Sequence, residues 1–218
     1  FYPPDPSSKG SCFIGGNIAE NSGGPKAVKY GVVKDYVINL EVVLPNGEII
    51  WTGSNVLKNS TGYNLTQLMV GSEGTLGIVT KIVLKLIPLP KYDLLMLAPF
   101  KDLEKASAAV SAIFRAGITP SAMELMEIDS IKIVSKMVDS TAFPVTDDIA
   151  AHLIIEVDGN NMDVLMGEME SIAEVLTQFD AGEIFFADDA QQKTERVSKI
   201  FRIGGIFNGL RGPQQRSG

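Results

Sequence analysis

The sequence predicts an α+β protein in two parts, and three features of its 218 residues lead to that prediction. The first part combines apolar, strand-like runs with segments rich in glycine and proline. In the second part, strand-like and helix-like patterns alternate along the chain. Pro88 and Pro90 stand between the two parts, where a strand cannot continue. We therefore expect a first domain over residues 1–90, a second domain over residues 91–203, and an irregular or non-native tail over residues 204–218.

The first domain is expected to contain strands and turns. Residues 35–53, "DYVINLEVVLPNGEIIWTG", are two apolar-rich runs joined by "PNG". An Asn-Gly step between such runs favours a hairpin because both residues tolerate a positive φ. Residues 80–90, "TKIVLKLIPLP", alternate apolar residues with Lys81 and Lys85, as a half-buried strand does.

The second domain is expected to repeat a strand–helix–strand order. "LLMLAPF" is typical of a strand, and "DLEKASAAVSAIFRAG" of a helix with Asp102 as its N-cap and Gly117 as its stop. "SAMELMEIDSIKIVSKMV" follows, part strand and part helix. "AAHLIIEVDG" is typical of a strand, "MDVLMGEMESIAEVLTQFDAG" has helical apolar spacing, and "EIFFA" is a short last strand. This order predicts an open sheet with helices on one face.

Composition excludes several classes of function. The net charge is −7 without a run of Lys or Arg, so we expect no nucleic-acid partner. No apolar stretch reaches the roughly 20 residues of a membrane span, so we expect no transmembrane segment. One cysteine, Cys12, cannot form an internal disulfide, which fits a reducing, cytoplasmic compartment. With His152 as the sole histidine, we also expect no metal site.

Three bare, turn-prone segments lie in the first domain: "PPDPSS" (residues 3–8), "FIGGNIAENSGGPKAVKYG" (residues 13–31) and "GSEGTLGIVT" (residues 71–80). Glycine lets backbone N–H groups come close to a ligand, and such loops can hold a pyrophosphate. A tight turn between strands explains any one of them equally well, and none has the spacing of a Rossmann glycine loop. Three together indicate one extended ligand that the backbone surrounds.

The same segments resemble a known family. "PPDPSS", "IGGNIAENSGGPKAVKYGVVKDYVINLEVVLPNGE" and "KNSTGYNLTQLMVGSEGTLGIVTKIVLKLIP" are similar to successive flavin-contacting segments of FAD-linked oxidases of the vanillyl-alcohol oxidase superfamily. The likeness runs from the first residue to about Arg202 and is strongest to the branch of the glycolate oxidase flavin subunit, D-lactate dehydrogenase and D-2-hydroxyglutarate dehydrogenase. It implies the C-terminal part of a PCMH-type FAD-binding domain over residues 1–90, and part of an α/β-plait (ferredoxin-like) cap domain over residues 91–203.

The resemblance also implies which residues contact FAD. They are Pro4, Asp5, Ser8, Gly15, Gly16, Asn17, Ala19, Asn21, Ser22, Gly24, Tyr30, Gly31, Gly71, Ser72, Glu73, Gly74, Thr75, Gly77 and Ile78. Glu73 is expected to accept hydrogen bonds that fix its loop, with acid–base catalysis as the alternative. Asn59, Thr61, Gly62 and Tyr63 belong to the family pattern too, although a structural turn explains them equally well. Cys12 is interpreted as a small buried side chain, with a covalent bond to the flavin as the alternative.

The function that the resemblance implies is oxidation of a D-2-hydroxy acid, of the glycolate or D-lactate type, to the 2-oxo acid by hydride transfer to FAD. The partners are then a small 2-hydroxy acid, an electron acceptor, and other oxidase subunits or a second copy in a homodimer. The parent protein would be cytoplasmic, either free in the cytoplasm or peripheral to the inner membrane. A different class of function is also open: a non-catalytic small-molecule-binding or dimerisation module built on the plait.

The chain departs from the family pattern at both ends. Nothing matches the glycine-rich pyrophosphate turn that precedes "PPDPSS" in the family, nor the later histidine-rich strand and Glu-His pair. Gly204 and Gly205 stand where the family has basic residues. We therefore expect an inactive fragment that holds FAD non-covalently and either weakly or not at all, without catalytic or metal-binding residues; a degenerate homologue is the alternative.

Two expectations concern geometry. Residues 15–24 and 71–78 should lie side by side and line one groove, because a single dinucleotide must contact both. Lys26 and Lys29 should face the solvent or the rim of their loop, where they either neutralise the pyrophosphate or remain a solvated pair.

Overall fold

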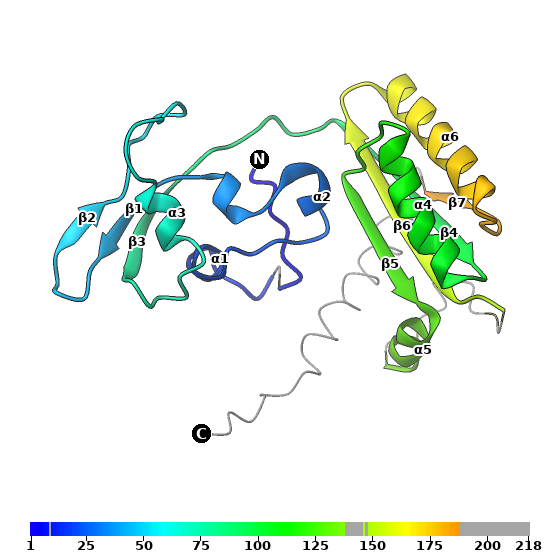
Figure 1. Cartoon of the computed structure of the whole chain (residues 1–218), viewed down its shortest axis with the longest axis horizontal. Helices are drawn as coiled ribbons and strands as arrows, with labels where there is room; N and C mark the ends of the chain where they lie inside the picture. The colour runs from blue at the N-terminus through cyan, green and yellow to red at the C-terminus, as the bar shows by residue number, and fades with distance from the viewer. Residues whose placement is uncertain (9, 138–145, 147, 188–218) are drawn as a thin grey trace. The chain divides into compact units, whose positions relative to one another are not determined.

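The computed structural model describes residues 1–8, 10–137, 146 and 148–187. The chain divides into two compact units, Phe1–Leu89 and Pro90–Gly218 (Figure 1). The predicted tail over residues 204–218, and the preceding residues 188–203 of the predicted second domain, lie outside the described residues. An α+β architecture is therefore shown by the described part of the chain.

The first unit is built on a three-stranded antiparallel sheet in the order β2-β1-β3. Its strands are β1 (Val37–Val43), β2 (Ile49–Trp51) and β3 (Ile78–Leu84). The predicted hairpin between the first two is confirmed. Its turn is closed by the amide of Gly47, which donates to the carbonyl of Leu44 (2.9 Å), and Gly47 has a φ of 85°. The predicted third strand is confirmed as well, and it pairs with the other edge of β1.

Four short helical segments in the first unit correct the expectation of strands and turns alone. They are α1 (Ile14–Glu20), α2 (Ala27–Tyr30), the 3-10 turn η1 (Val33–Asp35) and α3 (Leu65–Met69). The segment "FIGGNIAENSGG", expected to be a loop, is thus helical over most of its first half. Helix α1 buries Ile18 completely and ends at Asn21 in the left-handed conformation, so burial of one apolar side chain outweighs the low helix propensity of its two glycines.

The second unit has the order β4 (Tyr92–Phe100), α4 (Leu103–Arg115), β5 (Ala122–Glu127), α5 (Ile128–Met137), β6 (Ala151–Gly159), α6 (Met162–Gln178) and β7 (Phe185–Ala187). Its strands form an antiparallel sheet in the order β5-β6-β4-β7. This is the expected plait, and each element agrees in type with the sequence prediction.

Helix caps explain where the long helices of the plait begin. The carboxylate of Asp102 accepts hydrogen bonds from the amides of Glu104 (2.8 Å) and Lys105 (3.2 Å), so the predicted N-cap of α4 is confirmed. Asn161 caps α6 in the same way, accepting from the amide of Asp163 at 3.0 Å.

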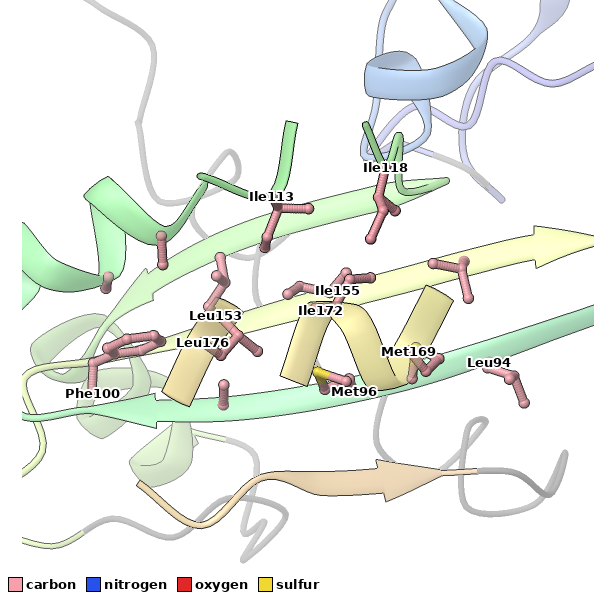
Figure 2. Packing of buried hydrophobic residues seen from close by; sticks show 14 of the residues in the cluster. Leu94, Met96, Phe100, Ile113, Ile118, Leu153, Ile155, Met169, Ile172 and Leu176 are labelled. Carbon is pink, nitrogen blue, oxygen red and sulfur yellow. The ribbon is translucent and has the colours of Figure 1, made fainter. Parts of the chain in front are cut away.

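The main core of the second unit lies between the sheet and the helices α4 and α6. Figure 2 shows side chains of β4 and β6, such as Phe100 and Leu153, directed towards Ile113 of α4 and Leu176 of α6. All four are at most 1% exposed. Because side chains alternate along a strand, the other residues of β4 and β6 face away from these helices, and a smaller apolar cluster around Ile154 lies among them. In the described part of the chain, none of the helices combines the length and the hydropathy needed to cross a membrane.

Candidate functional site

A pocket of about 520 Å³ opens among the N-terminal segments of the first unit. Pro4 and Asp5 of the first turn-prone segment line it, and so does Asn17 of α1; these three were among the residues predicted to contact FAD. Its other lining residues are Phe1, Tyr2, Pro3, Pro6, Gly10, Cys12, Ile14, Lys26 and Leu89. A volume of this size suits part of a large cofactor or a small ligand.

The first two turn-prone segments pack directly on each other at Gly24. This residue has a φ of 145°, and a Cβ placed on it would overlap with the backbone carbonyl of Asp5. Only glycine fits both the conformation and the contact. Gly24 therefore positions Pro4 and Asp5 at the wall of the pocket.

The second and third segments also meet, as predicted. The amide of Gly71 donates to the carbonyl of Ile18, and the amide of Glu73 donates to the carbonyl of Ala19, both at 2.9 Å. A Cβ on Gly71 would lie 3.2 Å from the Cβ of Asn21. Residues 15–24 and 71–78 therefore lie side by side as expected. Of these residues only Asn17 lines the pocket described above, so a groove shared by both segments, and their contact with a cofactor, stay predictions.

The predicted glycines fall into two groups by what surrounds them. A Cβ on Gly15, Gly16 or Gly74 would meet nothing within 4 Å, so their backbone is open to an approaching ligand. A Cβ on Gly77 would lie 2.6 Å from Cγ1 of Val42, and one on Gly31 would overlap with the carboxylate of Asp35. Packing requires glycine at position 77, and the φ of 79° adds to the contact at Gly31, so a ligand is not needed to explain either residue.

Hydrogen bonds to backbone carbonyls fix the conformation of the third segment, residues 71–80. Thr75 donates both its amide (3.0 Å) and its hydroxyl (2.6 Å) to the carbonyl of Ser72. Glu73 has a φ of 52°, and its exposed carboxylate makes no hydrogen bond with the described residues. Among the described residues, the amide of Glu73 fixes the loop through Ala19, and a role of its carboxylate stays a prediction. Ile78 begins β3, and its side chain is 68% exposed.

Several other predicted residues stabilise turns. The side chain of Asn21 accepts from the amide of Lys34 (2.9 Å), and the carbonyl of Ser22 accepts from the amide of Val33 (3.1 Å). The carbonyl of Tyr30 accepts from the hydroxyl of Tyr36 at 2.6 Å. The backbone carbonyl of Ser8 accepts hydrogen bonds from the amides of Ser11 and Cys12, and these bonds close the turn after "PPDPSS".

Tyr2 is a pocket residue that the sequence analysis missed. Its hydroxyl is buried and has no hydrogen-bond partner among the described residues. Burial, with a smaller contribution from the nearby Cys12 thiol, raises the pKa of Tyr2 to about 12, so the hydroxyl stays protonated at neutral pH. A buried donor without a partner is costly, and a bound ligand can satisfy it. In the sequence, only its position next to Pro3 and Pro4 of the first turn-prone segment could have indicated this role.

The titratable groups around the pocket differ in exposure. Lys29 is exposed, with its Nζ 5.5 Å from the centre of the Tyr30 ring, whereas Lys26 is half-buried and lines the pocket. Cys12 is half-buried too. His152 lies on β6 as predicted, fully buried between the register partners Pro99 and Met126. Within residues 1–8, 10–137, 146 and 148–187, no three His, Cys, Asp or Glu side chains gather as a metal ion would require.

Comparison with known proteins finds a matching family for each of the two units. The family described as FAD linked oxidases, C-terminal domain, matches residues 89–202, and a FAD binding domain family matches residues 1–53. D-lactate dehydrogenase of Anaerostipes hadrus is 40% identical over 197 residues, which is 89% of this chain and 41% of that protein. Glycolate oxidase subunit GlcD of Bacillus subtilis is 42% identical over 192 residues, 88% of this chain and 40% of that protein. The chain thus spans about two fifths of the length of these relatives.

A solved structure of alkyldihydroxyacetonephosphate synthase superposes with a TM-score of 0.71 over 96% of this chain and 41% of the other. At 22% identity, this likeness shows the fold alone. The family matches over both units support FAD as the cofactor.

Proposed function

Because this chain belongs to the FAD-linked oxidases, we propose that it forms part of an enzyme that oxidises a D-2-hydroxy acid of the glycolate or D-lactate type to the 2-oxo acid. The substrate class comes from the names of two relatives, glycolate oxidase subunit and D-lactate dehydrogenase. The structural observation that supports the proposal is the joining of α1 to residues 71–73 by two backbone hydrogen bonds, next to a pocket that α1 itself helps to line.

The residues around this junction fit a dinucleotide. FAD, when bound, supplies the flavin that accepts the hydride from the substrate carbon. Gly15, Gly16 and Gly74 leave their backbone open, so phosphate oxygens can approach it closely. Lys26 places a cation at the pocket wall, and the Tyr2 hydroxyl offers a buried donor.

The 218 residues alone are proposed to lack the base that the reaction needs. Oxidation of a 2-hydroxy acid requires a group that takes the hydroxyl proton, and imidazole is the usual one. The sole imidazole, His152, lies on β6 with 0% exposure, so no substrate reaches it without a rearrangement of the sheet. We expect weak FAD binding and no turnover above that of free flavin.

A titration of the purified chain with FAD, followed by quenching of flavin fluorescence, tests the binding site. Gly16→Val fills the open space on α1 and is expected to weaken FAD binding at least tenfold. Gly167→Val is the matched control: Gly167 is also a helical glycine with nothing within 4 Å of its added Cβ, but it lies on α6. Equal affinities of the two variants would contradict the proposed site.

Tyr2→Phe tests whether the buried Tyr2 hydroxyl contributes to stability or to FAD binding. Removing a donor that has no partner in the described part of the chain should leave the unfolding midpoint equal or higher. If the hydroxyl donates a hydrogen bond to the cofactor, its removal should lower the FAD affinity roughly tenfold, which corresponds to about 1.4 kcal/mol. An unchanged affinity would remove Tyr2 from the site and leave the glycine backbone as its only support.

An activity assay tests the chemistry. The chain, with excess FAD and an artificial electron acceptor, is incubated with D-lactate or glycolate. Turnover above the free-flavin rate would overturn the proposed inactivity of the isolated chain. FAD binding without turnover is the expected result, and absence of any FAD binding would favour a module that binds another ligand.

A further inference from the structure

The turn of the hairpin between β1 and β2 (Figure 1) contains the step Asn46-Gly47, and both residues are exposed to water. Asparagine is one of the chemically labile residues of proteins. It is most labile before glycine, because no Cβ then hinders the backbone nitrogen of the second residue. Neither residue lines the pocket described above, so the proposed function gives this step no role.

The reaction open to such a step is deamidation. The Gly47 nitrogen loses its proton and forms a bond to Cγ of Asn46, the Cγ–Nδ2 bond breaks, and ammonia leaves. Water then opens the cyclic imide at either of its carbonyl groups, which gives aspartate or isoaspartate. The net change is uptake of water and release of ammonia, so the reaction needs no oxidant, reductant or cofactor.

In this hairpin the attacking nitrogen is already engaged in a hydrogen bond. The amide of Gly47 donates to the carbonyl of Leu44, and the amide of Leu44 donates to the carbonyl of Glu48, both at 2.9 Å. The φ of Gly47 is 85°, as expected for an Asn-Gly hairpin turn. The Gly47 nitrogen can therefore react only after the bond that closes the turn has broken.

Glu48 holds the group that this nitrogen would attack. Asn46 Nδ2 donates to Glu48 Oε2 at 2.9 Å, and Asn46 Oδ1 accepts from the amide of Glu48 at 3.1 Å. Both polar atoms of the Asn46 side chain are thus bonded to the residue beyond Gly47. Its Cγ cannot turn towards the Gly47 nitrogen without losing these bonds, one of which is strengthened by the charge of the carboxylate.

We propose that Asn46 is a deamidation site that the native hairpin protects, and that the Glu48 carboxylate contributes to this protection. Aspartate at position 46 would place a second negative charge beside Glu48, and isoaspartate would add an atom to the backbone of the turn. Either product disturbs the turn that sets the register of Val43 with Ile49. The hydrogen bonds of the turn therefore preserve the pairing of β1 with β2 as well as the chemical identity of Asn46.

Peptide mapping by mass spectrometry, during incubation of the purified chain at mildly alkaline pH, measures the rate at Asn46. The map separates this step from Asn208-Gly209, the other Asn-Gly step of the sequence. The same incubation in urea breaks the hydrogen bonds of the turn and gives the unprotected rate. The folded chain should react at least about tenfold more slowly, because more than one hydrogen bond must break before attack.

Variants of Glu48 test its share in the protection. Glu48→Ala removes the acceptor of Asn46 Nδ2 and should speed deamidation of the folded chain roughly fivefold. Glu48→Gln keeps an acceptor oxygen and should react more slowly than Glu48→Ala. Glu183→Ala is the matched control, since it also removes an exposed carboxylate but lies in the second unit, and its rate should equal that of the unsubstituted chain.

Circular dichroism and Trp51 fluorescence verify the fold of each variant, and the comparison of the folded chain with the urea-treated chain depends on none of them. Equal rates at Asn46 in the folded and the urea-treated chain would overturn the proposal. A Glu48→Ala rate no higher than that of Glu183→Ala would overturn the role of the Glu48 carboxylate.

Discussion

The two units of this chain reach a defined structure by different means. In the second unit, one apolar cluster fills the space between a four-stranded sheet and two helices that each begin at a side-chain cap. In the first unit, a smaller cluster supports a sheet of three strands, and glycines with positive φ mark its turns. Its segments are joined by backbone hydrogen bonds such as that between Gly71 and Ile18.

This difference shows where each unit is sensitive to change. Burial of apolar side chains stabilises the second unit, so truncation of a core residue should matter most there. Close backbone contacts determine the structure of the first unit, so replacement of a glycine by a residue with a Cβ should destabilise this unit most. The first unit also leaves large apolar side chains in water, among them Phe13 (85% exposed) and Tyr63 (97% exposed).

The largest expected effect is that of Leu153→Ala in the core of the second unit. Leu153 is fully buried between the sheet and α4 and α6, so the truncation leaves a cavity and should cost about 2–5 kcal/mol of unfolding free energy. Trp51, the sole tryptophan, lies in the first unit, while the long helices α4 and α6 lie in the second. Urea unfolding should therefore shift when followed by circular dichroism and stay unchanged when followed by Trp51 fluorescence.

The control for this truncation is Leu89→Ala, which removes a side chain that is 69% exposed and should change the unfolding free energy by less than about 0.5 kcal/mol. Equal shifts of both signals in Leu153→Ala would mean that the two units unfold as one, and would remove the contrast between them.

Gly24→Ala tests the first unit in the opposite way, by adding an atom. The φ of 145° and the overlap of the new Cβ with the carbonyl of Asp5 should together cost about 2–3 kcal/mol, seen in the transition of Trp51 fluorescence. Gly47→Ala is the matched control: its φ is also positive, at 85°, but its Cβ meets nothing within 4 Å, so a cost of about 1 kcal/mol is expected. Equal costs would show that the contact with Asp5 has no energetic role.

The same contrast explains which parts of the fold could be predicted from the sequence. Each element of the plait has a clear apolar period, and the Asp102 cap and the helix that follows it are local features. The helix α1 could not be predicted, because "IGGNIAE" has two glycines and its helical state depends on burial of Ile18 by distant residues. A sequence pattern contains no information on such tertiary contacts.

For the candidate site, the glycine segments could be recognised, but their surroundings could not. Gly16 and Gly77 both lie in glycine-rich segments and cannot be told apart from the sequence. An added Cβ would meet nothing within 4 Å at Gly16, but it would overlap with Val42 at Gly77. The role of Tyr2 in the pocket follows from the fold of residues distant in the chain, since Lys26 and Leu89 line the same space. Only the three-dimensional contacts separate glycines that packing requires from glycines that a ligand can use.

Helix caps give a smaller test of the contrast. Asp102→Ala removes two hydrogen bonds at the start of α4 and should cost about 1 kcal/mol in the second unit. Phe13 is the N-cap of α1 and makes no side-chain cap hydrogen bond, so Phe13→Ser should instead stabilise the first unit by about 0.5 kcal/mol. The two changes are measured by circular dichroism and by Trp51 fluorescence, respectively. A loss of stability in Phe13→Ser would indicate that the exposed ring has a packing role.

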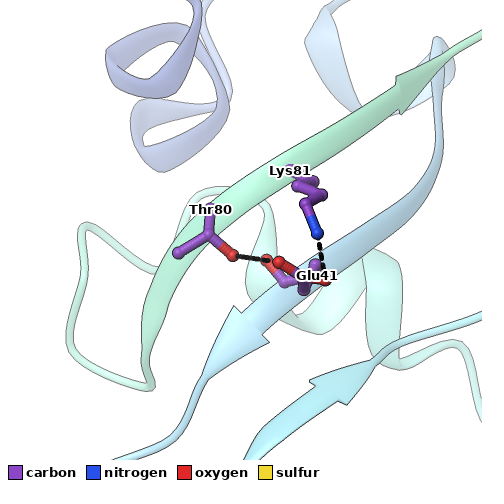
Figure 3. Close-up of polar contacts among 3 residues, drawn as sticks. All are labelled: Glu41, Thr80 and Lys81. Atoms are coloured by element: carbon purple, nitrogen blue, oxygen red, sulfur yellow. Dashed lines mark hydrogen bonds and ion pairs between the residues drawn. The ribbon is translucent and has the colours of Figure 1, made fainter.

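The smallest expected effect is a pH response of opposite sign at two carboxylates, one in each unit. Hydrogen bonds from Lys81 and Thr80 (Figure 3) lower the pKa of Glu41 in the first unit below its ordinary value of 4.5. Burial raises the pKa of Glu124 on β5 of the second unit above the same value. A carboxylate with a lowered pKa stabilises the fold above its unfolded pKa, and that contribution is lost as the pH falls through the folded pKa. One with a raised pKa stabilises the fold below its unfolded pKa, and that contribution is lost as the pH rises through the folded pKa.

Acidification from neutral pH should therefore strengthen the second unit first, as Glu124 takes up its proton above pH 4.5, and weaken the first unit afterwards, as Glu41 does so below pH 4.5. Glu124→Gln should remove the first response and leave the Trp51 transition unchanged. Glu41→Gln should remove the second, which Trp51 reports directly because it is the register partner of Glu41. Since Glu41 and Lys81 lie at the surface of the sheet, added salt should reduce the Glu41 response more than that of the half-buried Glu124. If Glu124→Gln and Glu41→Gln altered the acid response in the same direction, the opposite environments assigned to these two carboxylates would be wrong.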